Sequence, residues 1–133
     1  MKKLIIAILL ASSTQYAYAD NKSKSELNQT NSIEISTQDA KKALIKKDHI
    51  FIDVREKWEY DNGHIKGIKL IPLSKIPTES LKLDKKAKYI AVCGVGVRSK
   101  KAAEKMKKLG LNVVSMAGGM NEWQEKGYPV KKD

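Results

Sequence analysis

Residues 89–110, YIAVCGVGVRSKKAAEKMKKLG, carry the clearest structural pattern in the chain. It opens with five apolar residues, as a short buried strand would. Further on, Ala102, Ala103, Met106 and Leu109 recur at helical spacing among lysines, and Gly110 stands where helix ends favour glycine. A strand, a short glycine-containing loop and an amphipathic helix together form the repeating unit of a parallel α/β sheet.

Similar signals occur on both sides of this unit. Apolar runs predict further strands over residues 49–54, 68–71 and 113–117. Ser36 and Asp39 resemble the capping box that begins a helix, and a final helix is expected over residues 120–126. Short helical turns are expected within residues 56–60 and 77–83. The alternation predicts an α/β domain with a small, central, mostly parallel β-sheet and helices on both faces.

The first 19 residues have the layout of a secretory signal peptide. A positive start precedes the apolar run of residues 4–11, and Ala-Tyr-Ala at 17–19 fits a small-x-small cleavage site. Such a run is far shorter than the roughly 20 residues that span a bilayer. Residues 20–32 are polar and are expected to form a flexible linker before a domain over residues 33–133. We therefore expect a mature protein without a membrane anchor. It is expected in the periplasm, or outside the cell if the organism has no outer membrane.

Lysine supplies almost all of the positive charge. The formal net charge is +11, and only Arg55 and Arg98 among the 26 basic residues are arginines. The lysines are spread along the chain without interleaved aromatic residues, which favours a solvated coat over nucleic-acid binding. Because arginine offers a planar fork of donors that lysine cannot copy, the two arginines are candidates for geometry-dependent roles.

Cys93 is the only cysteine, so no internal disulfide can form. An unpaired thiol in an exported domain is either inert through burial or retained for its reactivity. Here it ends a predicted strand, and glycines alternate with valines before the helix. Backbone N–H groups of such a loop can converge on an anion beside a helix N-terminus, where the pKa of a thiol is lowered. The loop therefore favours a nucleophile over a buried strand cysteine.

The spacing from Cys93 to Arg98 separates two chemistries. Protein tyrosine phosphatases place five residues between cysteine and arginine, which makes a loop large enough for phosphate. Here Ser99 occupies that position and the arginine comes one residue earlier. The smaller loop fits a sulfur atom better, which disfavours a phosphatase or an arsenate reductase.

Three groups of motifs together resemble the rhodanese-like sulfurtransferase family. The first comprises DVRE (53–56), EY (59–60), GHIKG (63–67) and IPL (71–73). The second is Cys-x-x-Gly-x-Arg-Ser at 93–99, and the third is GG (118–119), Trp123 and GYPV (127–130). Each motif is weak alone, whereas their combination in this order is specific. With the signal peptide, the resemblance implies a rhodanese-like fold in a single-domain, exported thiosulfate sulfurtransferase.

The resemblance also implies roles for individual residues. Cys93 is the expected nucleophile, and Arg98 either braces the loop or presents charge to the donor. The substrate sulfur is expected to bind to the loop residues Gly94, Val95, Gly96, Val97 and Ser99. Structural roles are expected for Asp53, Arg55, Glu59 and His64, with Arg55 paired to Glu59 four residues on. Trp123 and Tyr128 are expected in the core.

The implied reaction is a double displacement through a persulfide on Cys93. The thiolate takes the outer sulfur of a donor such as thiosulfate, and an acceptor, namely cyanide or a thiol that could belong to a protein, then removes it. Neither a metal nor an organic cofactor is implied, and we expect a monomer.

One position departs from the family pattern. Many thiosulfate-using relatives carry a basic residue directly after the cysteine, where this chain has Gly94 within an apolar loop. Lys100 and Lys101 could compensate from the start of the helix. The departure keeps an alternative open, in which the domain is a non-catalytic sulfur carrier or a module that docks a partner.

Overall fold

The computed structural model describes residues 32–133, which contain one five-stranded β-sheet with every pair of neighbouring strands parallel. Its strands lie in the order β1-β5-β4-β2-β3. They are β1 (Glu34–Ile35), β2 (Ile50–Asp53), β3 (Lys69–Leu70), β4 (Lys88–Val92) and β5 (Asn112–Met116). The central strand β4 leads directly to Cys93.

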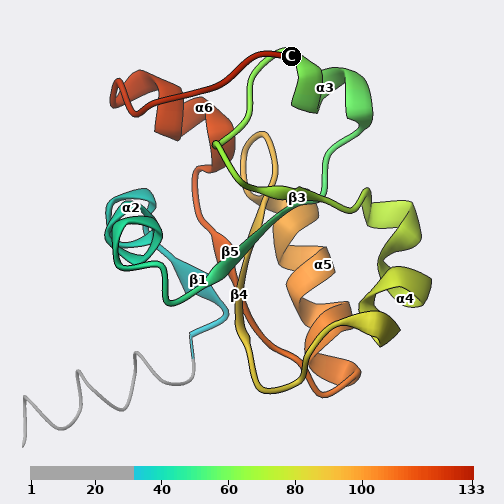
Figure 1. Cartoon of the computed structure of the whole chain (residues 1–133). Helices are drawn as coiled ribbons and strands as arrows, with labels where there is room; N and C mark the ends of the chain where they lie inside the picture. The colour runs from blue at the N-terminus through green and yellow to red at the C-terminus, as the bar shows by residue number, and fades with distance from the viewer. Residues whose placement is uncertain (1–31) are drawn as a thin grey trace, which may run out of the picture. The chain divides into compact units, whose positions relative to one another are not determined.

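Helices cover both faces of this sheet (Figure 1). One face carries α2 (Thr37–Lys46) and α6 (Gly119–Glu125), and the other carries α4 (Ile76–Glu79) and α5 (Val97–Lys108). The short helix α3 (Lys57–Asp61) follows β2, and two 3-10 turns, η1 (Leu73–Lys75) and η2 (Ser80–Lys82), flank α4. The predicted α/β class, with helices on both faces, is confirmed.

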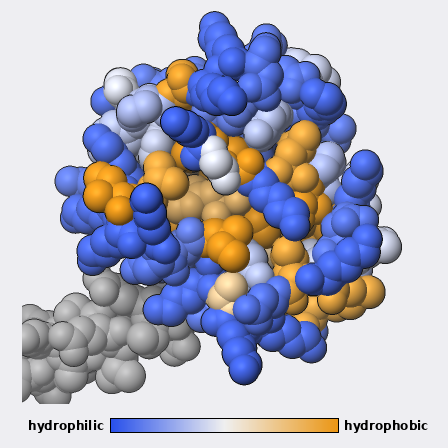
Figure 2. Space-filling view, in the orientation of Figure 1, coloured by the Kyte–Doolittle hydropathy of each residue, from blue (hydrophilic) through white to orange (hydrophobic). Residues whose placement is uncertain are grey.

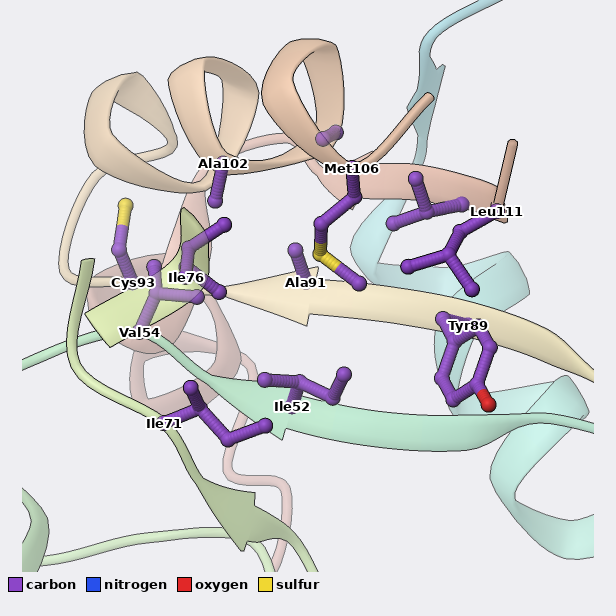
Figure 3. Packing of buried hydrophobic residues seen from close by; sticks show 12 residues of the cluster. Ile52, Val54, Ile71, Ile76, Tyr89, Ala91, Cys93, Ala102, Met106 and Leu111 are labelled. Atoms are coloured by element: carbon purple, nitrogen blue, oxygen red, sulfur yellow. The ribbon is translucent and has the colours of Figure 1, made fainter. Parts of the chain in front are cut away.

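The core is divided by the sheet into two apolar clusters. Along β4, Tyr89 and Ala91 belong to one cluster while Ile90 and Val92 belong to the other, because successive strand residues point to opposite faces. Figure 3 shows the cluster beneath α5, in which Cys93 lies at one end with its side chain toward the first turn of that helix. The nucleophile candidate is therefore part of the packed core.

The predicted strands and helices are confirmed to within a residue or two, but the prediction omits strand β1 and the 3-10 turn η1. Strand β1 is missing from the prediction because two residues show no periodicity. Its position depends on partners far along the chain: Ser115 N–H donates to Ile33 O at 2.7 Å, and Ala117 N–H donates to Ile35 O at 2.9 Å.

Residues 33–133 form one compact unit. The predicted signal peptide (1–19) and all but the last residue of the predicted linker (20–32) lie outside the described residues. No helix between residues 32 and 133 combines the length and the apolar character needed to cross a bilayer. Figure 2 shows one face of this unit, on which hydrophilic residues lie at the periphery and apolar residues lie toward the middle.

The predicted ion pair between Arg55 and Glu59 is wrong. Arg55 lies in the turn before α3, so the two residues do not share a helix face. Its guanidinium folds back onto the strand end, where Nη2 donates to Asp53 Oδ2 at 2.8 Å and to Gly63 O at 2.7 Å. The side chains of Asp53 and Arg55 are 0% and 7% exposed, so this buried pair ties β2 to the loop before β3.

Two aromatic contacts lie near the C-terminal residues, of which Lys131 exchanges backbone hydrogen bonds with His64. The buried ring of His64 stacks on Tyr60 with centroids 3.7 Å apart, and its Nδ1–H donates to Tyr60 O at 2.8 Å. Trp123 lies in the core as predicted, edge-on to Tyr128, and its Nε1–H donates to Pro129 O at 2.9 Å.

Candidate active site

Cys93 lies immediately after β4, and Gly96 begins α5 as its N-terminal cap. Gly96 has a φ of 100°, a left-handed conformation that glycine adopts without steric cost. Helix α5 therefore starts at Val97, directly after this cap. The connection is so short that the sulfur lies beneath the first turn of the helix (Figure 3).

The sulfur of Cys93 is almost enclosed, since the residue is only 1% exposed. Gly96 N–H donates to Sγ at 3.0 Å, and the thiol donates to Ser99 Oγ at 3.3 Å. Burial alone raises the pKa of this thiol. Once the sulfur is ionised, it can accept hydrogen bonds from the Ser99 hydroxyl and from the backbone N–H groups of Ser99, Gly96 and Val95, and these outweigh burial and leave the pKa lowered. The loop thus favours the thiolate, which is the reactive form.

The carbonyl groups of the same loop are bound by α6. Met120 N–H donates to Cys93 O at 2.8 Å, and Asn121 N–H donates to Gly94 O at 3.0 Å. Because the N–H and C=O of a trans peptide point in opposite directions, carbonyls held toward α6 leave the following N–H groups facing the other way. The start of α6 therefore sets which side of the loop presents donors.

Gly119 makes this contact possible. A Cβ at this position would lie 2.5 Å from both Cys93 O and Gly94 O, and the residue has a φ of 57°. The Gly118-Gly119 pair, recognised in the sequence as part of a C-terminal motif, thus packs directly against the loop after Cys93.

Arg98 is bound by Glu59. Its Nη1 and Nη2 donate to Glu59 Oε2 and Oε1 at 2.8 and 2.7 Å, a bidentate pair that ties α5 to α3. Hydrogen bonds from Arg98 are the main reason that the pKa of Glu59 falls to about 2, against the opposing effect of burial. Of the two roles left open by the sequence, this geometry favours bracing.

We expect Glu59→Gln to lower the free energy of unfolding by about 1–2 kcal/mol at pH 7, because Arg98 is partly solvent-screened but doubly bonded. The pKa of Glu59 is depressed in the folded state from 4.5 to about 2, so the carboxylate stabilises the fold above pH 4.5 and loses this effect as the pH falls toward 2. Urea unfolding over that range should therefore show wild type and variant converging.

The exposed pair Lys57–Asp61 provides the control. Asp61→Asn should change the free energy of unfolding by no more than about 0.5 kcal/mol. A difference between wild type and Glu59→Gln that is the same at pH 7 and pH 2.5 would contradict the prediction.

The rim of the site is apolar next to lysines. Val95 and Val97 are each 59% exposed. Together with Gly96, Lys100 and Lys101, they line an open hollow of about 460 Å³ beside the loop. The predicted contribution of the two lysines to donor binding stays a prediction. Among residues 32–133, no group of three His, Cys, Asp or Glu side chains could hold a metal ion.

Only some of the predicted site residues lie next to the sulfur of Cys93. Cys93, Gly96 and Ser99 meet at the sulfur, and Arg98 covers Gly94 while bound to Glu59. Asp53 and Arg55 lie apart from the sulfur, in the buried ion pair at the end of β2, and His64 forms a backbone bridge with Lys131. Sequence reasoning missed Ser115, whose hydroxyl lies 2.7 Å from that of Ser99. The available signal was a single polar residue within the apolar run of β5.

Comparisons with known proteins find similar chains. The model of the rhodanese-like domain family matches residues 36–126. A Bacillus subtilis protein, YtwF, named as a candidate sulfurtransferase, is 32% identical over 97 residues, which cover 72% of this chain and 94% of that protein. Another from that organism, YrkF, whose name proposes a sulfur carrier, is 37% identical over 76 residues, covering 56% of this chain and 41% of YrkF.

Among solved structures, a rhodanese-related protein from Thermoplasma volcanium has a TM-score of 0.71 and 35% identity. The match covers 75% of this chain and 98% of that one. The match thus spans more than nine tenths of YtwF and of the Thermoplasma protein but less than half of YrkF.

Proposed function

The chain belongs to the rhodanese-like domain family, and we propose that it is an exported sulfurtransferase that carries a sulfane sulfur on Cys93. The observation that carries the proposal is the sulfur environment, in which Gly96 N–H and the Ser99 hydroxyl contact Sγ and the loop carbonyls are bound by α6. Such an arrangement stabilises negative charge on sulfur with groups that are already in place.

In the first half of the proposed reaction, the Cys93 thiolate attacks the outer sulfur of a donor such as thiosulfate. An S–S bond forms on Cys93, the S–S bond of the donor breaks, and sulfite leaves with its electron pair. In the second half, cyanide or a thiolate attacks the terminal sulfur, giving thiocyanate or a new persulfide and restoring the thiolate. Covalent catalysis of this kind divides one difficult transfer into two easier steps.

The test is the intact mass of the protein after incubation with thiosulfate or polysulfide. A gain of one sulfur atom that disappears when cyanide or a thiol is added supports the proposal. If neither donor changes the mass, the proposed function is wrong.

A sulfur-carrier role is the second candidate, and the absence of a charged residue at Gly94 favours it. A carrier would form the persulfide but turn over poorly with small acceptors. A stable persulfide, with steady-state turnover no faster than that of a Cys93→Ser control, would therefore identify a carrier.

Export is part of the proposal and is supported by the layout of residues 1–19. Fractionation of cells that express the whole chain should recover a shortened form outside the cytoplasm. Recovery of full-length protein in the cytoplasm would remove export from the proposal and leave the sulfur chemistry untouched.

We expect Gly94→Lys to raise kcat/KM for thiosulfate roughly three- to tenfold, which corresponds to one charge-assisted contact at a solvent-accessible site. The side chain can be accommodated, because a Cβ at Gly94 meets only Arg98 Nη2, at 3.5 Å. Arg98 is already neutralised by Glu59 and should repel the new lysine little. Initial rates of thiocyanate formation over a range of thiosulfate concentrations measure the effect.

Gly94→Met is the control, since it adds an unbranched chain without charge. If methionine raises thiosulfate use as much as lysine does, or if lysine has no effect, charge at this position does not limit donor binding.

A further inference from the structure

Ser115 places a second buried hydroxyl behind the one that contacts the sulfur. It lies on β5, is 0% exposed, and its Oγ is 2.7 Å from Ser99 Oγ. Within residues 32–133, Ser99 Oγ is the only hydrogen-bond partner that Ser115 Oγ has. A buried hydroxyl proton without an acceptor is costly, so the Ser115 hydroxyl must donate to Ser99 Oγ.

The bond from Ser115 determines which acceptors are available to the hydroxyl proton of Ser99. Ser99 has one hydroxyl proton and three neighbouring acceptors: Gly96 O at 3.2 Å, Ser115 Oγ at 2.7 Å, and the sulfur of Cys93 at 3.3 Å once it is ionised. With Ser115 donating, its oxygen no longer competes for that proton. When Cys93 loses its proton, the Ser99 hydroxyl can turn from Gly96 O to the thiolate.

The bond from Ser115 also strengthens the bond to sulfur. A hydroxyl that accepts one hydrogen bond becomes a better donor in the next, and this effect is largest where water is excluded. All three side chains are essentially buried, with Cys93 at 1% and both serines at 0% exposure.

We propose that Ser115 is a positioning residue for sulfur transfer: its hydroxyl directs the Ser99 proton to the sulfur of Cys93 and stabilises the thiolate. The thiolate is both the nucleophile of the first half-reaction and the leaving group of the second, when the S–S bond breaks and the electron pair stays on Sγ. The role in turnover rests on the proposed function, whereas the effect on the thiol rests only on the Ser115–Ser99–Cys93 geometry.

The test is the pH dependence of alkylation of Cys93 by iodoacetamide in the whole chain. Because Cys93 is the only cysteine, the rate reports a single thiolate. We expect Ser115→Ala to move the profile to higher pH and to lower the rate roughly three- to tenfold on its acid side, the equivalent of one hydrogen bond, with an unchanged plateau at high pH.

Two variants with side chains of equal size distinguish the effect of the hydroxyl from the effect of packing. Ser115→Thr keeps the hydroxyl and Ser115→Val replaces it with a methyl group of similar shape, so Thr should resemble wild type and Val should resemble Ala. Ser80→Ala removes a buried serine hydroxyl that has no hydrogen-bond partner in the described residues, and it should leave the profile unchanged. Thermal unfolding of each variant verifies that it is folded.

The proposal is overturned if Ser115→Ala leaves the profile unchanged, if Thr shifts it as much as Val, or if Ser80→Ala shifts it equally. Alkylation needs no sulfur donor, so this result is separate from the mass test above. A shifted profile in a protein that never gains sulfur would refute the proposed function while leaving Ser115 as the residue that stabilises the thiolate.

Discussion

Cys93→Ser is expected to gain no sulfur from thiosulfate or polysulfide under conditions in which the wild-type mass increases by one sulfur atom. The chain has no other cysteine that could carry the persulfide. A serine hydroxyl is not ionised at neutral pH and cannot replace the thiolate as a nucleophile. Turnover should fall by at least about 10³-fold, since removing a covalent nucleophile removes the whole pathway. Intact-mass spectrometry and steady-state rates measure the two effects.

The substitution nearly preserves shape, so folding should survive it. Serine at position 93 can still meet Gly96 N–H and the Ser99 hydroxyl, and we expect a change in the free energy of unfolding of no more than about 2 kcal/mol. Retained sulfur loading in a folded Cys93→Ser protein would contradict the assignment of the nucleophile. Wild-type hydrolysis of a generic phosphate ester that depends on Cys93 would instead restore the phosphatase hypothesis.

Gly119→Ala is expected to lower the free energy of unfolding by about 2–5 kcal/mol, which combines overpacking with the cost of a left-handed residue that has a Cβ. The new Cβ would lie 2.5 Å from two backbone oxygens, and neither can move as a flexible side chain would. Relief requires the loop to separate from α6, so Cys93 O and Gly94 O would lose the bonds from Met120 and Asn121. Sulfur loading should therefore slow as stability falls. Urea unfolding and loading rates measure both.

Gly127→Ala is the matched control. Gly127 also has a positive φ, 69°, but nothing lies within 4 Å of a Cβ placed there. Gly127→Ala should lower the free energy of unfolding by only roughly 1–2 kcal/mol, the conformational cost of a left-handed residue with a Cβ. It should load sulfur at the wild-type rate. Equal losses in both variants would show that close packing against the loop is not what requires glycine at position 119.

Much of the fold could be predicted because its central strands are buried on both faces. The runs that became β2, β4 and β5 are continuous and apolar, a local signal that needs no knowledge of the partner strand. Strand β1 has no such signal, since its two residues become a strand only by pairing with β5. The same limit explains the error at Arg55, where a spacing of four residues predicts a contact only if both residues lie on one helix.

The candidate site divides in the same way. The strand, the alternating glycines and the following helix are contiguous, so the sequence alone pointed to Cys93 and the loop after it. The groups that support the loop come from elsewhere in the chain: Glu59 reaches Arg98 across 39 residues, and Ser115 reaches Ser99 across 16. Nothing in their local patterns encodes these pairings, because they depend on how α3 and β5 pack around the end of β4.

Backbone donors contact the sulfur, and this affects which residues of the loop can be substituted. Main-chain N–H groups are the same whichever side chains the loop carries, so the backbone hydrogen bonds to Sγ do not depend on the identity of those side chains. The exposed valines at 95 and 97 can be exchanged without removing a single donor from the sulfur. In the proposed reaction, substitutions at these two valines would therefore change contacts with the donor or acceptor while the backbone donor at Sγ stays in place.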